Sequence, residues 1–164
     1  MSLSYEQSVL VREYLSPRAM AVVGASNKKE KFGNLACREL KARSFSIFPV
    51  NPHENEIYGK RCYRTINELG TLINRMLIVL PPDMTRKLVS DLNPEFVSYV
   101  WMQNGAESAE AIRICNAKGI KTIYGQCILM HAQPVRSYHL LHRWWAKSVH
   151  SQFSIVRLNC KGES

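Results

Sequence analysis

The sequence predicts an α/β fold in which a doubly wound parallel sheet of about five strands lies between two layers of helices. Short apolar segments alternate with segments of helical periodicity five times along the chain. The apolar segments are mostly continuous rather than alternating with polar residues, which is typical of strands buried on both faces. Right-handed crossovers between such strands give three layers and place ligands at the carboxyl ends of the strands.

Length and composition fit one ordinary domain of this kind. The chain has 164 residues, of which 46% are hydrophobic and 21% are charged, so widespread disorder is not expected. Its net charge of +9 favours anionic partners, which include phosphorylated small molecules, nucleic acids and acidic membranes. The net charge alone does not distinguish among these partners.

The first part of the chain contains two predicted helices and two predicted strands. Apolar residues at helical spacing predict a helix over 5–15, which ends before Pro17. The run AMAVVG at 19–24 is nearly all apolar, as in a buried strand. Helical spacing returns over 33–43, and FSIFPV at 45–50 is the second predicted strand.

The middle of the chain repeats this alternation. A loop and a short helical turn near TINEL (65–69) lead to RMLIVL at 75–80, the third strand, which two prolines end. Residues 84–92 have helical spacing, and FVSYVWM at 96–102 is the fourth strand.

The last helix and strand follow directly. Residues 107–119 predict a helix with Ala109, Ile112 and Cys115 facing inward, and its final glycine stands where a helix ends in the left-handed conformation. The run IKTIYG at 120–125 is the fifth strand.

The first predicted strand runs into a turn suited to phosphate. Gly24, Ala25 and Ser26 are small enough for a ligand's phosphates to approach the backbone amides. A helix that starts near Gly33 would point its positive end the same way. The loop between them adds Lys28, Lys29 and Lys31. The alternative is an ordinary strand-to-helix turn with solvated lysines.

A standard NAD site is disfavoured by two residues. The dinucleotide fingerprint needs a second glycine where this chain has Ser26, and an acid at the end of the second strand, where it has Val50-Asn51-Pro52. NADP stays open, because it does not need the acid.

Three further strands end in residues compatible with a nucleotide. Asn51 could bond a base or a ribose beside the flat wall of Pro52, and Pro81-Pro82 forms a stiff apolar ledge suited to stacking an adenine. Polar Gln103-Asn104 follows the fourth strand. Each of these pairs could also be a plain turn.

The ordered segments AVVGAS, KFGN, IFPVNP, IYGKRCYRTINEL, LIVLPP, VWMQNG and GIKTIYGQC resemble those of the small CoA-binding proteins. These are single Rossmann-like domains, similar to the CoA-binding domain of the succinyl-CoA synthetase alpha subunit. The resemblance covers about residues 6 to 130 and implies a domain over 1–130 that binds CoA, or an acyl-CoA, as its cofactor.

The resemblance also implies which residues form the site. The phosphates would be held by Gly24, Ala25, Ser26, Lys31 and Gly33. The adenosine side would be lined by Val50, Asn51 and Pro52. The adenine and the start of the pantetheine arm would border on Leu80, Pro81 and Pro82, with Met84 and Thr85 behind them. The thiol end would lie toward Gln103 and Asn104.

The chain departs from the family pattern at two places. His53 and Glu54 follow Asn51-Pro52, where a basic residue is common, so the lysines of the first loop could take over that phosphate contact. Three apolar residues follow Cys127, where relatives have C-x-x-I-E with its acid.

No pair of nucleophile and base stands out, so we expect a binding protein rather than an enzyme. Two alternatives from other classes remain: a small NADP-dependent oxidoreductase, and an adaptor for nucleic acid or a membrane. Cys127 could form a mixed disulfide with the CoA thiol, although a structural cysteine is the favoured interpretation.

The cysteines and the chain termini predict a cytoplasmic protein. Five cysteines stand at 37, 62, 115, 127 and 160 with no CxxC pair and no zinc-ligand spacing, which suits reduced thiols and no metal site. Charges inside the N-terminal pattern exclude a signal peptide. The longest uncharged stretch, 122–135, is shorter than the about 18 apolar residues that a membrane span needs.

Residues 131–164 form a predicted helical extension that is basic and rich in aromatic residues. The segment PVRSYHLLHRWWAKSVHSQF is a basic amphipathic pattern, and SIVRL at 154–158 could add an edge strand. We expect the extension to pack on the domain or on a second copy, so that the protein is a monomer or a homodimer. Binding to nucleic acid is not favoured, and an anionic membrane is the other alternative.

Overall fold

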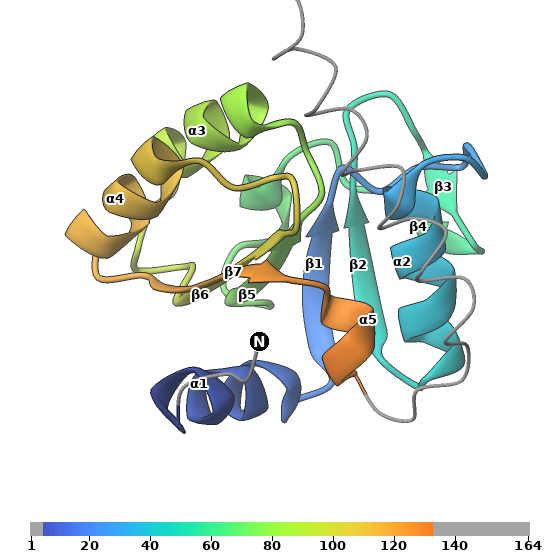
Figure 1. Ribbon diagram of the computed structural model, residues 1–164. Helices are drawn as coiled ribbons and strands as arrows, with labels where there is room; N and C mark the ends of the chain where they lie inside the picture. The colour runs from blue at the N-terminus through green and yellow to red at the C-terminus, as the bar shows by residue number, and fades with distance from the viewer. Residues whose placement is uncertain (1–4, 133–164) are drawn as a thin grey trace, which may run out of the picture. The chain divides into compact units, whose positions relative to one another are not determined.

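The computed structural model describes residues 5–132, and in them five parallel strands form one sheet (Figure 1). The strands are β1 (Ala19–Val23), β2 (Ser46–Val50), β5 (Arg75–Ile78), β6 (Tyr99–Gln103) and β7 (Lys121–Gln126). Their order across the sheet is β2-β1-β5-β6-β7. The chain therefore winds outward in both directions from β1 and β5, which confirms the doubly wound prediction and puts the switch point between these two strands.

Helices cover both faces of the sheet. One face carries α1 (Tyr5–Leu15), α2 (Phe32–Ala42) and α5 (Ile128–His131), and the other carries α3 (Pro82–Asp91) and α4 (Ala109–Ala117) (Figure 1). On the first face, the Trp101 ring of β6 packs against Tyr14 of α1 at 5.3 Å and against His131 of α5 at 5.7 Å between ring centroids.

The sheet is buried on both sides, which explains its continuous apolar runs. Ala21, Met76 and Val100 belong to a core cluster with Val89 of α3 and Cys115 of α4. Their neighbours in sequence point to the opposite face and are also buried; these are Met20, Val22, Leu77 and Trp101.

Two local features form where the sequence predicts them. The short helical turn is the 3-10 helix η1 (Ile66–Leu69), with a capping box between Thr65 and Glu68. Gly119 has φ of +70° after α4, and the amide of Ile120 donates to the carbonyl of Cys115 at 2.9 Å. These contacts form the glycine-terminated helix end that the sequence indicates.

The structure corrects three details. The loop after β2 contains a hairpin of β3 (Glu56–Ile57) and β4 (Lys60–Arg61), which is too short to show a strand pattern. Strand β6 starts at Tyr99 instead of residue 96, because the chain is still turning after Asn93. The predicted inward position of Ala109 is wrong, because this residue is exposed at the first turn of α4 and Ala111 is buried instead.

The predictions for residues 133–164, including the edge strand at 154–158, lie outside the described residues. None of the helices in the described range is long and apolar enough to cross a membrane.

Candidate functional site

Gly24 begins the turn that follows β1 and cannot be replaced without strain. Its φ is +88°, and a Cβ atom here would lie 2.9 Å from Cδ2 of Leu80. The amide of Gly24 donates to the carbonyl of Val50 at 3.0 Å, and the amide of Val79 donates to Val23 at 2.9 Å. The turn is thus joined to the ends of both neighbouring strands, β2 and β5.

Gly33 brings the start of α2 against the same turn. A Cβ atom at this position would lie 2.1 Å from the carbonyl oxygen of Gly24, a distance that no side chain can tolerate. Lys31, the N-cap residue of α2, makes no side-chain capping bond. The first turn of the helix therefore lies beside the turn after β1, where its positive end favours an anion.

Two asparagines fix the peptide planes of the turn. Asn51 donates from its side-chain amide to the carbonyl of Ala25 at 2.7 Å, and Asn34 donates to the carbonyl of Ser26 at 3.0 Å. Because the C=O and N–H of one peptide point in opposite directions, holding these carbonyls fixes the directions of the amides of Ser26 and Asn27.

Asn34 is itself held by the hairpin. It is 3% exposed, and its side-chain oxygen accepts from the Tyr58 hydroxyl at 2.7 Å. Our sequence reasoning missed Asn34 and Tyr58 as parts of the site. A buried asparagine on the apolar side of a helix was the available signal for the first, and nothing in the sequence pointed to the second.

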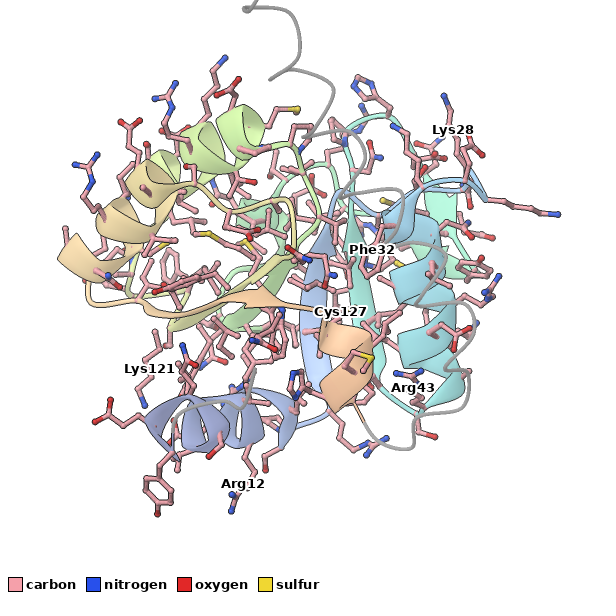
Figure 2. All side chains as sticks on the ribbon, viewed as in Figure 1. Arg12, Lys28, Phe32, Arg43, Lys121 and Cys127 are labelled. Carbon is pink, nitrogen blue, oxygen red and sulfur yellow. The ribbon has the colours of Figure 1, made fainter. Side chains whose placement is uncertain are left out.

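A carboxylate contacts the far end of the turn. The Asn27 side-chain amide donates to Glu54 Oε2 at 2.7 Å and to the carbonyl of Glu56 at 2.8 Å, and the Asn27 backbone amide donates to Glu54 Oε1 at 3.3 Å. The lysines that follow are exposed, and within residues 5–132 their side chains make no ion pair; these are Lys28, Lys29 and Lys31. Figure 2 shows Lys28 projecting away from the body of the domain.

The predicted adenine ledge lies at the start of α3. Pro81 is its N-cap residue and Pro82 its first residue, and both are exposed. Met84 is 53% exposed beside them, whereas Thr85 is buried and its hydroxyl donates to the carbonyl of Leu80 at 3.3 Å. The buried Thr85 thus lies beneath the exposed prolines, and its bond to Leu80 supports the start of α3.

The other predicted site residues differ in accessibility. Val50 is buried at the end of β2, whereas Pro52 is exposed. Gln103 is 6% exposed and accepts from the amide of Ile128 at 3.2 Å, while Asn104 is exposed. The structure therefore gathers the predicted residues at the carboxyl ends of four strands. The side chains of Asn51, Thr85 and Gln103 already bond to the chain itself.

The described cysteines differ in burial. Cys127 is half-buried at the start of α5 (Figure 2), whereas the other three are buried. Burial raises the pKa of Cys37 to about 12, and burial also raises the pKa of Cys62 and of Cys115. The mixed disulfide at Cys127 stays a prediction. Within residues 5–132, no group of His, Cys, Asp and Glu side chains could hold a metal ion.

The strand order defines a Rossmann-like domain. At the carboxyl end of β1, its turn and the start of α2 form a place where a phosphate could bind. Residues 18–133 match the CoA binding domain family, and the chain belongs to that family.

Its relatives include both small and large proteins. A solved structure of a conserved hypothetical protein from Pyrococcus furiosus is 34% identical with a TM-score of 0.65, and the match covers 68% of this chain and 96% of that one. The uncharacterised protein YneT of Bacillus subtilis is 22% identical, with 68% of this chain and 82% of YneT covered.

The large relatives include acetate–CoA ligases. An ADP-forming acetate–CoA ligase of Archaeoglobus fulgidus is 27% identical, and the match covers 70% of this chain but 18% of the ligase. The chain thus matches less than a third of the length of that enzyme.

Proposed function

We propose that this chain binds CoA or an acyl-CoA, with the diphosphate on the turn at Gly24–Ser26. The close approach of Gly33 to Gly24 carries the proposal, because it brings the turn amides and the positive end of α2 to one place. Charge-assisted bonds from these groups to phosphate are about twice as strong as neutral ones.

The surrounding residues suit the rest of the ligand. The exposed Pro81-Pro82 ledge, extended by Met84, offers an apolar surface for adenine. The end of β2 at Asn51 and Pro52 lines the adenosine side. The pantetheine arm then runs along the sheet edge toward Gln103-Asn104, with the thiol or the acyl group beyond it.

The names of the ligase relatives support CoA as the ligand. Their ligation reaction is not carried over, because the match covers only 18% of the Archaeoglobus fulgidus enzyme. We infer a binding protein, because the sequence offers no evident pair of nucleophile and base.

Calorimetry on the purified chain tests this proposal. CoA, acetyl-CoA, NADP and a DNA oligomer are titrated separately, and the melting temperature is followed with each. We expect heat and a higher melting temperature with CoA or acetyl-CoA. No heat and no melting shift with millimolar CoA would reject the proposal, and tighter binding of NADP or DNA would favour the corresponding alternative.

A further inference from the structure

We propose that Glu54 determines specificity at this site and lowers the affinity for a ligand that carries a phosphate on its adenosine ribose. This inference rests on the proposed function. The chain still binds CoA, but Glu54 makes the affinity for CoA lower than it would be without this carboxylate, whereas dephospho-CoA, which lacks the ribose phosphate, is affected less.

The Glu54 carboxylate has a fixed position. It is half-buried, and both of its oxygens accept hydrogen bonds from Asn27, one of them from the backbone amide. Asn27 directly follows Ser26, and its side chain is held a second time by the carbonyl of Glu56. The two hydrogen bonds from Asn27 therefore hold the negative charge of Glu54 at the end of the proposed phosphate turn.

We place the ribose side of the proposed site at this carboxylate. In doubly wound sheets the ribose of a bound nucleotide meets the end of the second strand. Strand β2 ends at Val50, and Glu54 follows four residues later. The Glu54 amide donates to the carbonyl of Asn51 at 3.4 Å, which keeps this segment close to the strand end.

A phosphate on that ribose would meet a like charge. Two anions at such a site repel each other, and the repulsion is strongest when one of them cannot swing away. Lys28, Lys29 and Lys31 carry compensating charge, but their side chains are exposed to water, which screens that charge. The fixed carboxylate thus opposes the ribose phosphate more selectively than the lysines attract it.

The variant Glu54→Gln tests the inference, because it removes the charge and keeps the side-chain length. Calorimetry with CoA and dephospho-CoA gives the ratio of the two dissociation constants. For Glu54→Gln we expect the dissociation constant of CoA to fall about fivefold and that of dephospho-CoA to change less than about twofold. Glu54→Lys should change the ratio further in the same direction.

Glu56→Gln is the matched control. It removes an equal charge two residues away, and only the backbone carbonyl of Glu56 contacts Asn27. We expect the ratio of the dissociation constants of CoA and dephospho-CoA for this variant to equal that of the wild type.

The outcomes separate the two proposals. If the wild type shows no binding of millimolar CoA, the proposed function fails, whether or not dephospho-CoA binds. If it binds both and Glu54→Gln leaves their ratio unchanged or shifts it toward dephospho-CoA, the role of Glu54 is overturned. An equal change of the ratio in Glu56→Gln would also overturn it, because the effect would then come from net charge alone.

Discussion

Gly33 has the least space of any glycine in the described domain. A methyl group here would lie 2.1 Å from the Gly24 carbonyl, so α2 would have to move away from the turn. For Gly33→Ala we expect at least about a tenfold loss of CoA affinity and about 1–3 kcal/mol of destabilisation, as overpacking costs elsewhere. Calorimetry and urea unfolding measure the two quantities.

Gly119→Ala is the control for that variant. Gly119 has φ of +70° and open space around it, and it precedes β7 at the opposite end of the sheet. Its replacement should cost about 1 kcal/mol of stability through the backbone alone. CoA affinity should stay as in the wild type, and a similar loss in both variants would mean that Gly33 acts only through stability.

Lys31 lies next to the turn where we propose that the diphosphate binds. Lys31 is the N-cap residue of α2, and Gly33 in the first turn of this helix lies against Gly24. We expect Lys31→Ala to weaken CoA and dephospho-CoA by the same factor of about three to five, because the diphosphate is common to both. Titration of both ligands checks this, and a loss confined to CoA would place Lys31 at the ribose phosphate instead.

Single residues show where sequence reasoning succeeds and where it stops. Gly24 and Gly33 could be predicted to allow a close backbone approach, because only glycine serves that purpose. The direction of a polar side chain could not be predicted in the same way. From the sequence, Asn51 could bond a ligand or simply form a turn; in the structure its side-chain amide donates to the carbonyl of Ala25 and its side-chain oxygen accepts from the amide of His53, and a ligand contact stays a prediction.

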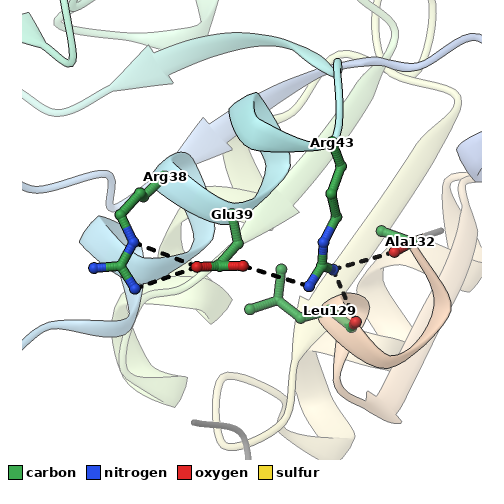
Figure 3. Close-up of polar contacts among 5 residues, drawn as sticks. All are labelled: Arg38, Glu39, Arg43, Leu129 and Ala132. Atoms are coloured by element: carbon green, nitrogen blue, oxygen red, sulfur yellow. Dashed lines mark hydrogen bonds and ion pairs between the residues drawn. The ribbon is translucent and has the colours of Figure 1, made fainter. Parts of the chain in front are cut away.

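Arg43 joins α2 to α5 (Figure 3). Its side chain is 1% exposed and donates to the carbonyls of Leu129 at 2.9 Å and Ala132 at 3.1 Å, and it pairs with Glu39 at 3.5 Å. Burial lowers the pKa of this guanidinium, while the charge of Glu39 raises it. Since α5 accepts these bonds near its C-terminal end, Arg43 stabilises a helix too short to form alone.

We expect Arg43→Ala to lower the free energy of unfolding by about 3 kcal/mol, because two buried carbonyls lose a charged donor. Arg38→Ala is the control: Arg38 pairs with the other oxygen of Glu39, but its side chain is 47% exposed. That pair should contribute less than about 0.5 kcal/mol. If both variants lose the same free energy of unfolding in urea, the stabilising contact of Arg43 is the one with Glu39 and not the one with α5.

Helix α1 also makes an ion pair with the sheet, and this pair depends on pH. Glu13 contacts Lys121 of β7 at 2.9 Å and the Tyr99 hydroxyl at 3.3 Å. The hydrogen bond and the charge of Lys121 lower the pKa of Glu13 below its ordinary value of 4.5. A lowered carboxyl pKa stabilises the folded state above that value, and this stabilisation is lost as the pH falls through the folded pKa.

Glu13→Gln should therefore be less stable than the wild type at pH 7, and the difference should vanish well below pH 4.5. Urea unfolding of both proteins at a series of pH values measures it. A difference that persists in acid would mean that Glu13 acts through packing and not through its charge.

The net charge of +9 acts on the molecule as a whole. Because the proposed ligand carries several phosphates, raising the salt concentration should weaken CoA binding through screening, and it should slow association. Titration at 50 and about 500 mM salt should show a several-fold increase in the dissociation constant. Affinity independent of salt would mean that apolar contacts of the adenine and the pantetheine arm dominate.

The sequence by itself determined the α/β class, the main strands and the turn after β1. Apolar runs, helical periodicity and glycine are local signals, and each reports the burial or the backbone angles of its own segment. Only the tertiary structure decided the strand order, the docking of the hairpin through Tyr58 and Asn34, and the contact of Glu54 with Asn27. These features join residues far apart in the chain, so their energies depend on packing that no single segment contains.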